Sequence, residues 1–310
     1  MKKRKIVVVG SCNTDLVIKV DHLPLPGETI IGRDFMTNQG GKGANQVVAA
    51  RRMGDEVVFV ARVGNDGFGQ QSLHLLEQEG LDPQYVHQTE GVPTGIAMIA
   101  VDEKGENSII VASGANASLS RQDMDAVKEM IEQETAVLLM QLESPLDTLM
   151  YVAEMAHKAG VQVVLNPAPF PKEPLPASFL QNIDIIIPNE TEAARMVGFD
   201  VVTEDDMLRA MQVIQQRGVE QVIITAGKAG SYTQLSGKLY NQPAFPVKPV
   251  DTTAAGDTYC GVLCVGLRDG LSLKDAMKQA STAASLSTTR LGAWPSIPQR
   301  EEILGAMKKW

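Results

Sequence analysis

Short apolar runs alternate with amphipathic stretches along most of the chain. Several runs are almost continuously apolar, as strands covered on both faces of a sheet are. These are "IVVVG" at 6–10, "EVVFVA" at 56–61, "AVLLMQL" at 136–142, "VQVVLNP" at 161–167, "IDIIIPN" at 183–189 and "EQVIITAG" at 220–227. Strand–helix alternation of this kind predicts a mostly parallel central sheet with right-handed crossovers, in a three-layer α/β/α fold.

The amphipathic stretches carry signals for the start of a helix. Before residues 146–159, Ser144 is a candidate cap and Pro145 suits the first helical position. Elsewhere a hydroxyl is followed three residues later by a carboxylate, which is the pattern of a capping box. The pairs are Ser120 with Asp123, Thr203 with Asp206, and Ser272 with Asp275.

Two stretches break this rhythm. Residues 16–39 alternate apolar and polar positions around a Pro-Gly turn, and residues 94–114 form a candidate hairpin that turns at "EKGE". Both predict antiparallel strands set apart from the main sheet, which could cover a site as a lid or pair two chains through an outer face. We expect a single domain over residues 1–310 with this β lid, because no internal repeat or long linker interrupts the sequence.

The charge and composition of the chain limit the kinds of partner that it can bind. The formal net charge of −9 argues against nucleic acid, and an anionic substrate would need local cations, a metal or helix N-termini. The cysteines Cys12, Cys260 and Cys264 fit a reducing compartment without disulfides, and the last two, four residues apart on a predicted helix, indicate core packing. No apolar run is long enough for a membrane span or a signal peptide, so we expect a cytoplasmic protein with no membrane partner.

Two polar stretches follow or precede buried elements near the N-terminus. "GSCNTD" at 10–15 follows the first strand, where Asn13 and Asp15 could hydrogen-bond a polyol or form an Asx turn. In "NQGGKGANQ" at 38–46, glycines surround Lys42 before a helix. They could let backbone amides approach a ligand, or allow a tight turn before a packed helix. The stretch matches neither the P-loop nor the dinucleotide pattern.

Two further stretches follow later strands. Asn189 and Glu192 in "PNETEA" have the spacing of a capping box, which is the simpler interpretation. The alternative is that Glu192 helps to organise a hydrated Mg²⁺. "TAGKAG" at 225–230 could pass a nucleotide or be a plain turn.

The stretch "VDTTAAGDTYCG" at 250–261 precedes a predicted helix. Its small residues leave the amides of 254–257 open to a phosphate, because a helix N-terminus attracts anions. Asp257 would then lie within reach of the group that attacks the phosphate. Capping alone does not explain why bulk is missing from four successive positions.

Together, "GGKGANQ" and "DTTAAGD" resemble the paired signatures of the PfkB, or ribokinase-like, family of sugar kinases. The resemblance covers essentially the whole chain, from "VVVGSCNTD" to "RLGAWPSIP". The family transfers the γ-phosphoryl group of ATP to a sugar hydroxyl. Stretches such as "LPLPGET", "LMQLESP" and "LNPAP" are similar to the members that act on the 5-hydroxyl of D-ribose, which implies ATP, Mg²⁺ and an activating K⁺ here, and a homodimer that forms through the lid.

The resemblance also implies roles for individual residues. Asp257 corresponds to the catalytic base, and the amides of Ala254, Ala255 and Gly256 to an anion hole. Residues implied to hold the sugar are Asn13, Asp15, Gly41, Lys42, Asn45, Glu143 and Asp257. Those implied for ATP and Mg²⁺ are Asn189, Glu192, Thr225, Gly227, Gly230, Gly256 and Ser281. Those implied for the monovalent cation, mostly through main-chain carbonyls, are Asp251, Thr253, Ser287, Arg290, Gly292 and Ser296.

One departure and several alternatives remain. Ala254 stands where the family frequently has glycine, so we expect alanine to be tolerated only if this residue avoids a positive φ. Asn13 and Asp15 favour a vicinal diol, yet a kinase for 2-deoxyribose or for another sugar or nucleoside is the nearest alternative. A non-catalytic sugar sensor is opposed by the intact Asp257, Lys42 and Glu192. A nicotinamide dehydrogenase is opposed by the missing G-x-G-x-x-G after the first strand.

Overall fold

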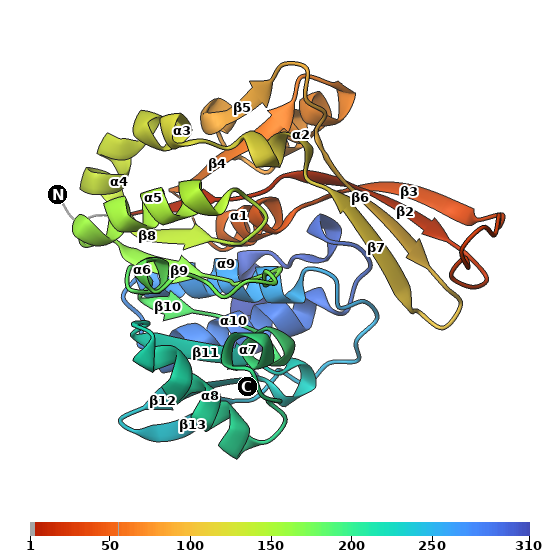
Figure 1. Ribbon diagram of the computed structural model, residues 1–310. Coiled ribbons are helices and arrows are strands. Elements are labelled where there is room, and N and C mark those ends of the chain that lie inside the picture. Colours follow the sequence, from red (N-terminus) through yellow and green to blue (C-terminus); the bar gives the residue numbers. More distant parts are fainter. Residues whose placement is uncertain (1–3, 55) are drawn as a thin grey trace.

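The structure is a computed structural model that describes residues 4–54 and 56–310. Within these residues the main sheet has nine strands in the order β13-β12-β11-β10-β9-β8-β1-β4-β5 (Figure 1). All neighbouring pairs from β5 to β11 are parallel, and β12 pairs antiparallel with both β11 and β13. The strands are β1 (Lys5–Val9), β4 (Val57–Gly64), β5 (Val86–Thr89), β8 (Thr135–Met140), β9 (Gln162–Leu165), β10 (Ile185–Ile186), β11 (Gln221–Thr225), β12 (Ser231–Leu235) and β13 (Lys238–Gln242). Every strand predicted from an apolar run is confirmed.

Helices cover both faces of this sheet, which confirms the three-layer fold. They are α1 (Lys42–Met53), α2 (Gly67–Gln78), α3 (Arg121–Ala126), α4 (Lys128–Glu134), α5 (Leu146–Lys158), α6 (Ala177–Leu180), α7 (Glu190–Val197), α8 (Glu204–Gln216), α9 (Ala255–Arg268), α10 (Leu273–Ser287) and α11 (Arg300–Met307). Short 3₁₀ turns lie at Pro83–Tyr85, Gly114–Ser118, Gly227–Ala229 and Trp294–Ser296.

The side chains of β1 alternate between two hydrophobic cores. Ile6 and Val8 pack in the core formed with α1, α2, α9, α10 and α11. Val7 and Val9 pack in the core formed with α3 to α8. A strand buried on both faces has no polar side, which is why its sequence is continuously apolar. Cys260 and Cys264 of α9 lie in the first of these cores, as predicted.

Three of the four predicted helix starts are confirmed. The carboxylates of Asp123 and Asp206 accept the backbone N–H of their capping residues, and the hydroxyl of Ser272 caps α10. The prediction for α5 is wrong by one residue. Pro145 has the extended ψ of 125° and is itself the cap, so its carbonyl accepts the first helical N–H groups. Ser144 therefore lies too early to cap, and its buried Oγ has no partner.

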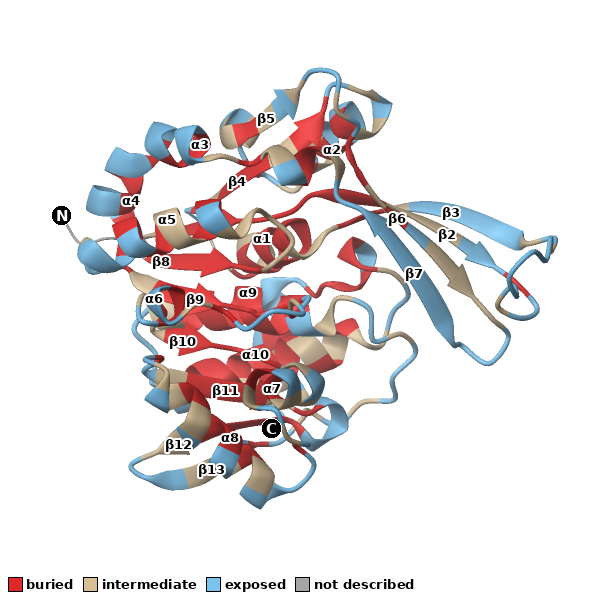
Figure 2. Cartoon of the chain, viewed as in Figure 1, coloured by how far each residue is buried: buried red, intermediate tan, exposed pale blue. Residues whose placement is uncertain are grey.

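A small sheet extends from the carboxyl ends of the main strands. Its strands, in the order β3-β2-β6-β7, are β2 (Asn13–Lys19), β3 (Arg33–Gly40), β6 (Gly95–Val101) and β7 (Asn107–Ala112). Both hairpins are antiparallel as predicted, but β2 and β6 pair in parallel, so the lid is a mixed sheet. The core strands of the main sheet are buried, whereas β3 and β7 are largely exposed (Figure 2).

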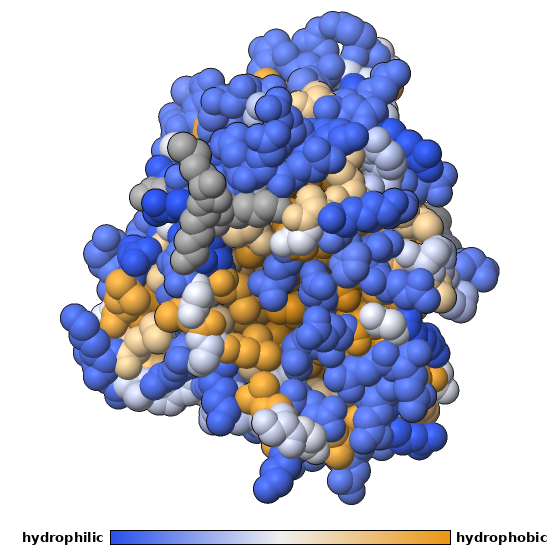
Figure 3. All heavy atoms as spheres, turned by 90° about the vertical axis from the view of Figure 1, so that its left-hand side faces the viewer, coloured by the Kyte–Doolittle hydropathy of each residue, from blue (hydrophilic) through white to orange (hydrophobic). Residues whose placement is uncertain are grey.

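The two edges of the main sheet differ. The small sheet projects from the edge at which the parallel strands end (Figure 1). The edge at which they begin is mostly hydrophilic, with apolar side chains gathered across its centre (Figure 3). Ligands of such sheets bind outside the carboxyl ends of the strands, which directs attention to the lid side. Across residues 4–54 and 56–310, no helix is both long and apolar enough to cross a membrane.

Candidate functional site

The two glycine-containing motifs meet at Asp257. This side chain lies in the first turn of α9 and is only 7% exposed. Its Oδ2 accepts a hydrogen bond from Nδ2 of Asn45 at 2.9 Å, and its Oδ1 accepts one from Nε2 of Gln46 at 2.9 Å. Both donors lie near the N-terminus of α1. Residues more than 200 positions apart thus fix one carboxylate between two helix N-termini.

A chain of buried amides supports this carboxylate. Nε2 of Gln46 also donates to Oδ1 of Asn166 at 3.1 Å, and its Oε1 accepts from Nε2 of Gln141 at 2.6 Å. Asn166 in turn donates to the carbonyl of Ile187 at 2.9 Å. Sequence reasoning did not select Gln46, Gln141 or Asn166. The available signal was a polar side chain directly after the buried strands β8 and β9, at the edge where such sheets bind ligands.

The glycines before α1 serve packing against the protein's own backbone. A Cβ on Gly41, which has a φ of +87°, would lie 2.7 Å from the backbone N of Asn13. A Cβ on Gly43 would lie 2.6 Å from the backbone N of Ser11. The N–H of Ala44 donates to the carbonyl of Ser11 at 2.8 Å. The glycines therefore allow a tight turn, which brings the start of α1 beside β2, and the binding role stays a prediction.

Asn13 and Asp15 lie in strand β2, so the Asx-turn alternative is wrong. Asn13 is buried, and its Oδ1 accepts a hydrogen bond from Nδ2 of Asn116 at 2.6 Å. The Oδ1 of Asn116 accepts the N–H of Cys12 at 2.8 Å. Asn116 was missed because only the fold brings it to β2. Its contacts fix the amide of Asn13 in one orientation.

Carboxylates gather on the sugar side of the predicted site. One oxygen of Glu143 accepts both the hydroxyl of Ser11 at 2.5 Å and the backbone N–H of Lys42 at 3.0 Å. Burial, followed by the negative charges of Glu143 and Asp257, raises the pKa of Asp15 to about 7, while Lys42 opposes this shift. The region thus combines fixed acceptors with a carboxyl group that resists ionisation.

Lys42 is the cation of the site. Burial would lower the pKa of its ammonium group, but the charges of Asp257, Glu143 and Glu192 raise that pKa above its usual value overall. Lys42 therefore stays charged among carboxylates. It lines the same cavity as Asp257 and Glu192, and its backbone N–H is bound to Glu143.

The start of α9 corrects one expectation. Ala254 is the cap residue and adopts a left-handed φ of +58°, although the sequence analysis expected alanine to avoid a positive φ. A left-handed conformation costs an L-residue about 1–2 kcal/mol, which the loop imposes here. The N–H of Ala255 donates to the carbonyl of Thr252 at 3.2 Å. The N–H groups of Gly256 and Asp257 make no backbone hydrogen bond with any described residue.

Two cavities meet at this helix start. The smaller, of about 300 Å³, is lined by Lys42, Glu192 and Asp257 among others. The larger, of about 510 Å³, runs past Ser281 and the segment 244–249. Both include Thr225, Thr252, Ala255 and Gly256 in their walls. The residues predicted for the nucleotide all line one or both cavities: Asn189, Glu192, Thr225, Gly227, Gly230, Gly256 and Ser281.

Asn189 and Glu192 form the capping box that their spacing predicts. The N–H of Asn189 donates to Oε2 of Glu192 at 2.9 Å, and the N–H of Glu192 donates to Oδ1 of Asn189 at 2.8 Å. Burial raises the pKa of Glu192 above its ordinary value. The capping role uses one carboxylate oxygen and leaves Oε1 for another partner. Mg²⁺ keeps several waters and needs few carboxylates, so this donor set fits a hydrated ion.

The side chains of the residues predicted for a monovalent cation make local contacts, whereas the prediction concerns mostly their main-chain carbonyls. Asp251 accepts the N–H and hydroxyl of Thr253 at 2.9 and 2.6 Å, and the N–H of Gly292 at 2.8 Å. The side chain of Arg290 instead pairs with Glu302 of α11. The hydroxyls of Ser287 and Ser296 donate to local carbonyls. Among the described residues, no group of three or more His, Cys, Asp or Glu could hold a metal ion.

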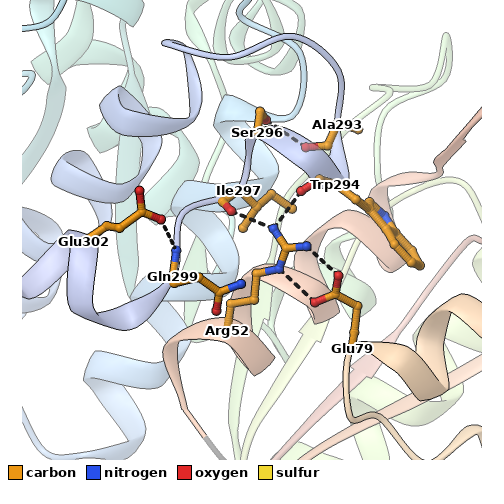
Figure 4. A network of polar contacts seen from close by, with 8 residues as sticks. All are labelled: Arg52, Glu79, Ala293, Trp294, Ser296, Ile297, Gln299 and Glu302. Atoms are coloured by element: carbon orange, nitrogen blue, oxygen red, sulfur yellow. Dashed lines mark hydrogen bonds and ion pairs between the residues drawn. The ribbon is translucent and has the colours of Figure 1, made fainter.

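The loop that carries Gly292 and Ser296 is anchored from below (Figure 4). Nη1 of Arg52, at the end of α1, donates to the carbonyls of Trp294 and Ile297 at 2.7 and 2.6 Å. The two carboxylate oxygens of Glu79 accept hydrogen bonds from Nε and Nη2 of the same guanidinium. Such a bidentate, partly buried pair fixes geometry better than an exposed one. It ties this loop to the helix that delivers Asn45 and Gln46 to Asp257.

Known proteins are similar to this chain in sequence and in fold over nearly its whole length. The sequence profile described as "pfkB family carbohydrate kinase" matches residues 3–300. Ribokinase of Haemophilus influenzae is 41% identical over 302 residues, which cover 97% of this chain and 98% of that protein. Deoxyribokinase of Salmonella typhi is 34% identical over 302 residues, covering 96% and 98%. The solved structure of Arabidopsis thaliana ribokinase complexed with ribose and ATP has a TM-score of 0.91 at 34% identity and covers 99% of both chains.

Proposed function

The chain belongs to the pfkB family of carbohydrate kinases, and we propose that it transfers the γ-phosphoryl group of ATP to the 5-hydroxyl of D-ribose, giving D-ribose 5-phosphate and ADP. The observation that carries the proposal is the buried Asp257 carboxylate. It is held by Asn45 and Gln46 at the junction of two cavities. The similarity to ribokinases over nearly the whole chain supports ribose as the acceptor.

Asp257 acts as the base. As the bond between the sugar oxygen and the γ-phosphorus forms, the bond to the leaving ADP oxygen breaks and the hydroxyl proton moves to the carboxylate. A carboxylate is a weak base for a free alcohol, so this transfer comes late. A positioned base contributes ~10²–10⁴-fold. Phosphoryl transfer otherwise depends on positioning and charge, which the N–H groups that open α9 and the Lys42 ammonium provide.

The residues that hold the sugar come from β2, from the start of α1 and from the segment after β8. Asn45 has a buried Oδ1 without a partner, as an acceptor awaiting a sugar hydroxyl does. Gly41 keeps the start of α1 close to β2, and Glu143 is preset by Ser11 and the Lys42 amide. Asn13 and Asp15 then recognise the vicinal diol.

ATP occupies the larger cavity, with its phosphates directed to the start of α9. Glu192 and Asn189 would hold a hydrated Mg²⁺, which would supply neutralising charge for the phosphates. Thr225, Gly227 and Gly230 form the turn that the nucleotide passes, and Ser281 faces it from α10.

We further propose that carbonyls around Asp251, Thr253, Ser287, Arg290, Gly292 and Ser296 hold K⁺. The hydrogen bonds of Asp251 already join the two loops concerned, so a cation there would stiffen the turn that opens α9. The rate at saturating substrates is expected to be higher in K⁺ than in Na⁺ or Li⁺ at equal ionic strength. Equal rates in all three salts would contradict this site.

The buried, unpaired cysteines support a cytoplasmic, reducing location. The small sheet supports a homodimer. Met98 pairs with Ile110 across β6 and β7, and both are more than half exposed on the face opposite Asp15. Monomeric soluble proteins seldom expose a contiguous apolar face of this kind.

The decisive experiment replaces the base. In Asp257→Asn, kcat is expected to fall by ~10²–10⁴-fold while calorimetry still detects ribose binding. Loss of sugar affinity together with turnover would make Asp257 chiefly a ligand contact. An assay of ATP consumption by the wild type separates a kinase from a sugar sensor.

Acceptor choice is tested separately. A site that hydrogen-bonds a hydroxyl rejects its absence strongly, so kcat/KM for ribose is expected to exceed that for 2-deoxyribose by at least ~10²-fold. Comparable values would favour a deoxyribokinase or a broader sugar kinase instead.

A further inference from the structure

One wall of the larger cavity is held without backbone hydrogen bonds. This wall is the segment 244–249, which follows β13 and leads towards α9. Pro246 and Pro249 have no N–H, and no residue of the segment makes a backbone–backbone hydrogen bond with the described chain. A strand or helix would fix such a wall through its main chain. Here side-chain packing must do so.

Phe245 provides that packing. Its ring lines the cavity and also contacts the ring of Trp310, with ring centroids 5.5 Å apart and an interplanar angle of 77°. This is the edge-to-face arrangement that aromatic pairs prefer. The contact joins the cavity wall to a residue that lies more than 60 positions further along the chain.

Trp310 is itself fixed to α10. Nζ of Lys278 donates to the carbonyl of Trp310 at 2.9 Å and lies 5.4 Å from the centroid of its indole ring. The N–H of Trp310 donates to the carbonyl of Met307 at 3.3 Å. The helix that carries Lys278 also carries Ser281 and Ala284, which line the cavity from the other side. Trp310 therefore contacts Phe245 of one wall and Lys278 of the helix that forms the other.

We propose that Trp310 is a positioning residue for nucleotide binding, which holds Phe245 and the segment 244–249 against α10 so that the base of ATP meets a preformed apolar wall. The inference rests on the proposed function, because the larger cavity is taken as the nucleotide site. Neither Phe245 nor Trp310 contacts the amide chain around Asp257. A change at Trp310 should thus alter nucleotide affinity and leave ribose affinity and kcat at saturating ATP nearly unchanged.

The test compares Trp310→Ala with Trp310→Phe. An aromatic edge contact of this type is worth roughly two- to tenfold in affinity, so Trp310→Ala should raise the KM for ATP and the Kd for AMP-PNP, measured with ribose present, by about that factor. Trp310→Phe keeps an aromatic ring against Phe245 and should restore most of the affinity. Lys278→Met, which releases Trp310 without removing it, should produce a smaller rise in the same two constants.

Tyr151→Ala is the matched control, since Tyr151 also has a cation near its ring but lies on α5, against the other core. It should leave the KM for ATP unchanged. If Trp310→Ala folds with unaltered KM and Kd, or if it lowers kcat and ribose affinity as much as nucleotide affinity, the inference is wrong and the proposed function stands. If the wild type neither binds AMP-PNP nor consumes ATP, the proposed function itself fails, and this inference with it.

Trp310 also gives a spectroscopic signal. The chain has two tryptophans, so Trp294→Phe leaves Trp310 as the single indole fluorophore. Its emission should shift when AMP-PNP binds and stay constant when ribose alone binds. An emission that ignores saturating AMP-PNP in a variant that still binds it would overturn the coupling between Trp310 and the cavity wall.

Discussion

Asp15, which we propose to contact the sugar, lowers the stability of the folded protein at high pH. Burial and the charges of Glu143 and Asp257 raise its pKa from 3.8 to about 7. Between about pH 4 and 7, the Asp15 carboxyl is therefore protonated in the folded protein and ionised in the unfolded chain. Because the folded pKa lies above the unfolded one, this contribution to the free energy of unfolding is complete below pH 4 and is lost as the pH rises through 7.

The corresponding prediction concerns Asp15→Asn, which removes the titration and keeps the shape. Relative to the wild type, its Tm is expected to be raised more at pH 8 than at pH 5, while its ribose affinity falls at both. Thermal melts at the two pH values measure the first effect and calorimetry the second. A Tm difference that is the same at pH 5 and pH 8 would contradict the raised pKa.

Ala254 is a second residue whose conformation has a cost. At a φ of +58°, glycine avoids the left-handed penalty of about 1–2 kcal/mol but loses about 0.4–1 kcal/mol through its freer unfolded chain. Ala254→Gly should therefore change the free energy of unfolding by between zero and about +1.6 kcal/mol, with kcat retained. Ala254→Val, a β-branched residue in this region, should lower both. Chemical denaturation and steady-state rates check the pair. A glycine variant as impaired as the valine variant would mean that the alanine methyl group, not φ, matters.

Residue-level prediction from sequence depended on local motifs and on the family resemblance that they carry. Lys42, Asn45 and Glu143 could be selected in this way, and hydrogen bonds or charge interactions link them to Asp257 or to Asp15. Their roles towards the sugar stay predictions. The amides that support the site could not be selected. Gln46, Asn116, Gln141 and Asn166 interact only after the strand order is set, and buried glutamine or asparagine has no local signature that distinguishes a support from an ordinary polar residue.

At the scale of elements, α1 links the two halves of the site. Its N-terminal end delivers Asn45 and Gln46 to Asp257, and its last turn places Arg52 against the carbonyl of Trp294 (Figure 4). The sequence predicted that a helix starts here, but not which helix it would face. Likewise each lid hairpin was predicted from its own turn, while the parallel pairing of β2 with β6 joins segments some 80 residues apart and has no local signal.

This arrangement of α1 predicts the effect of Gln46→Met. The substitution removes donors to Asp257 and Asn166 and leaves Gln141 without its acceptor, all in a buried region. The free energy of unfolding should fall by about 1–3 kcal/mol, and kcat by more than ribose affinity, since Asn45 alone would hold the carboxylate. Urea denaturation, kcat and ribose Kd are the measurements. The control is Gln279→Met, a buried glutamine of α10 outside the site. Equal losses of kcat in the two variants would show that Gln46 has only a structural role.

At the scale of the whole molecule, the small sheet β3-β2-β6-β7 exposes an apolar face to solvent in a single chain. Strand register places Asp15, Ala97 and Val111 on one face and Leu16, Met98 and Ile110 on the other. The face with Asp15 is turned towards Glu143, Asp257 and Lys42, which we propose to bind the sugar. The other face is apolar and exposed, at 59% for Met98 and 68% for Ile110. A small sheet with a solvated apolar face is marginal by itself, whereas a second copy of the same sheet would bury that face by two-fold symmetry.

The wild type should accordingly be a dimer at micromolar concentration, and Ile110→Asp should be a monomer, because two carboxylates would meet near a symmetric apolar contact. Multi-angle light scattering gives the masses directly. Val202→Asp is the control: Val202 is 75% exposed but lies outside the lid, so this variant should remain dimeric. A wild type that is monomeric, or an Ile110→Asp variant that stays dimeric, would remove the lid from the interface. If the monomer forms but still binds ribose through Asn13 and Asp15 with a raised KM, pairing of the sheets also stabilises the lid that closes over the sugar.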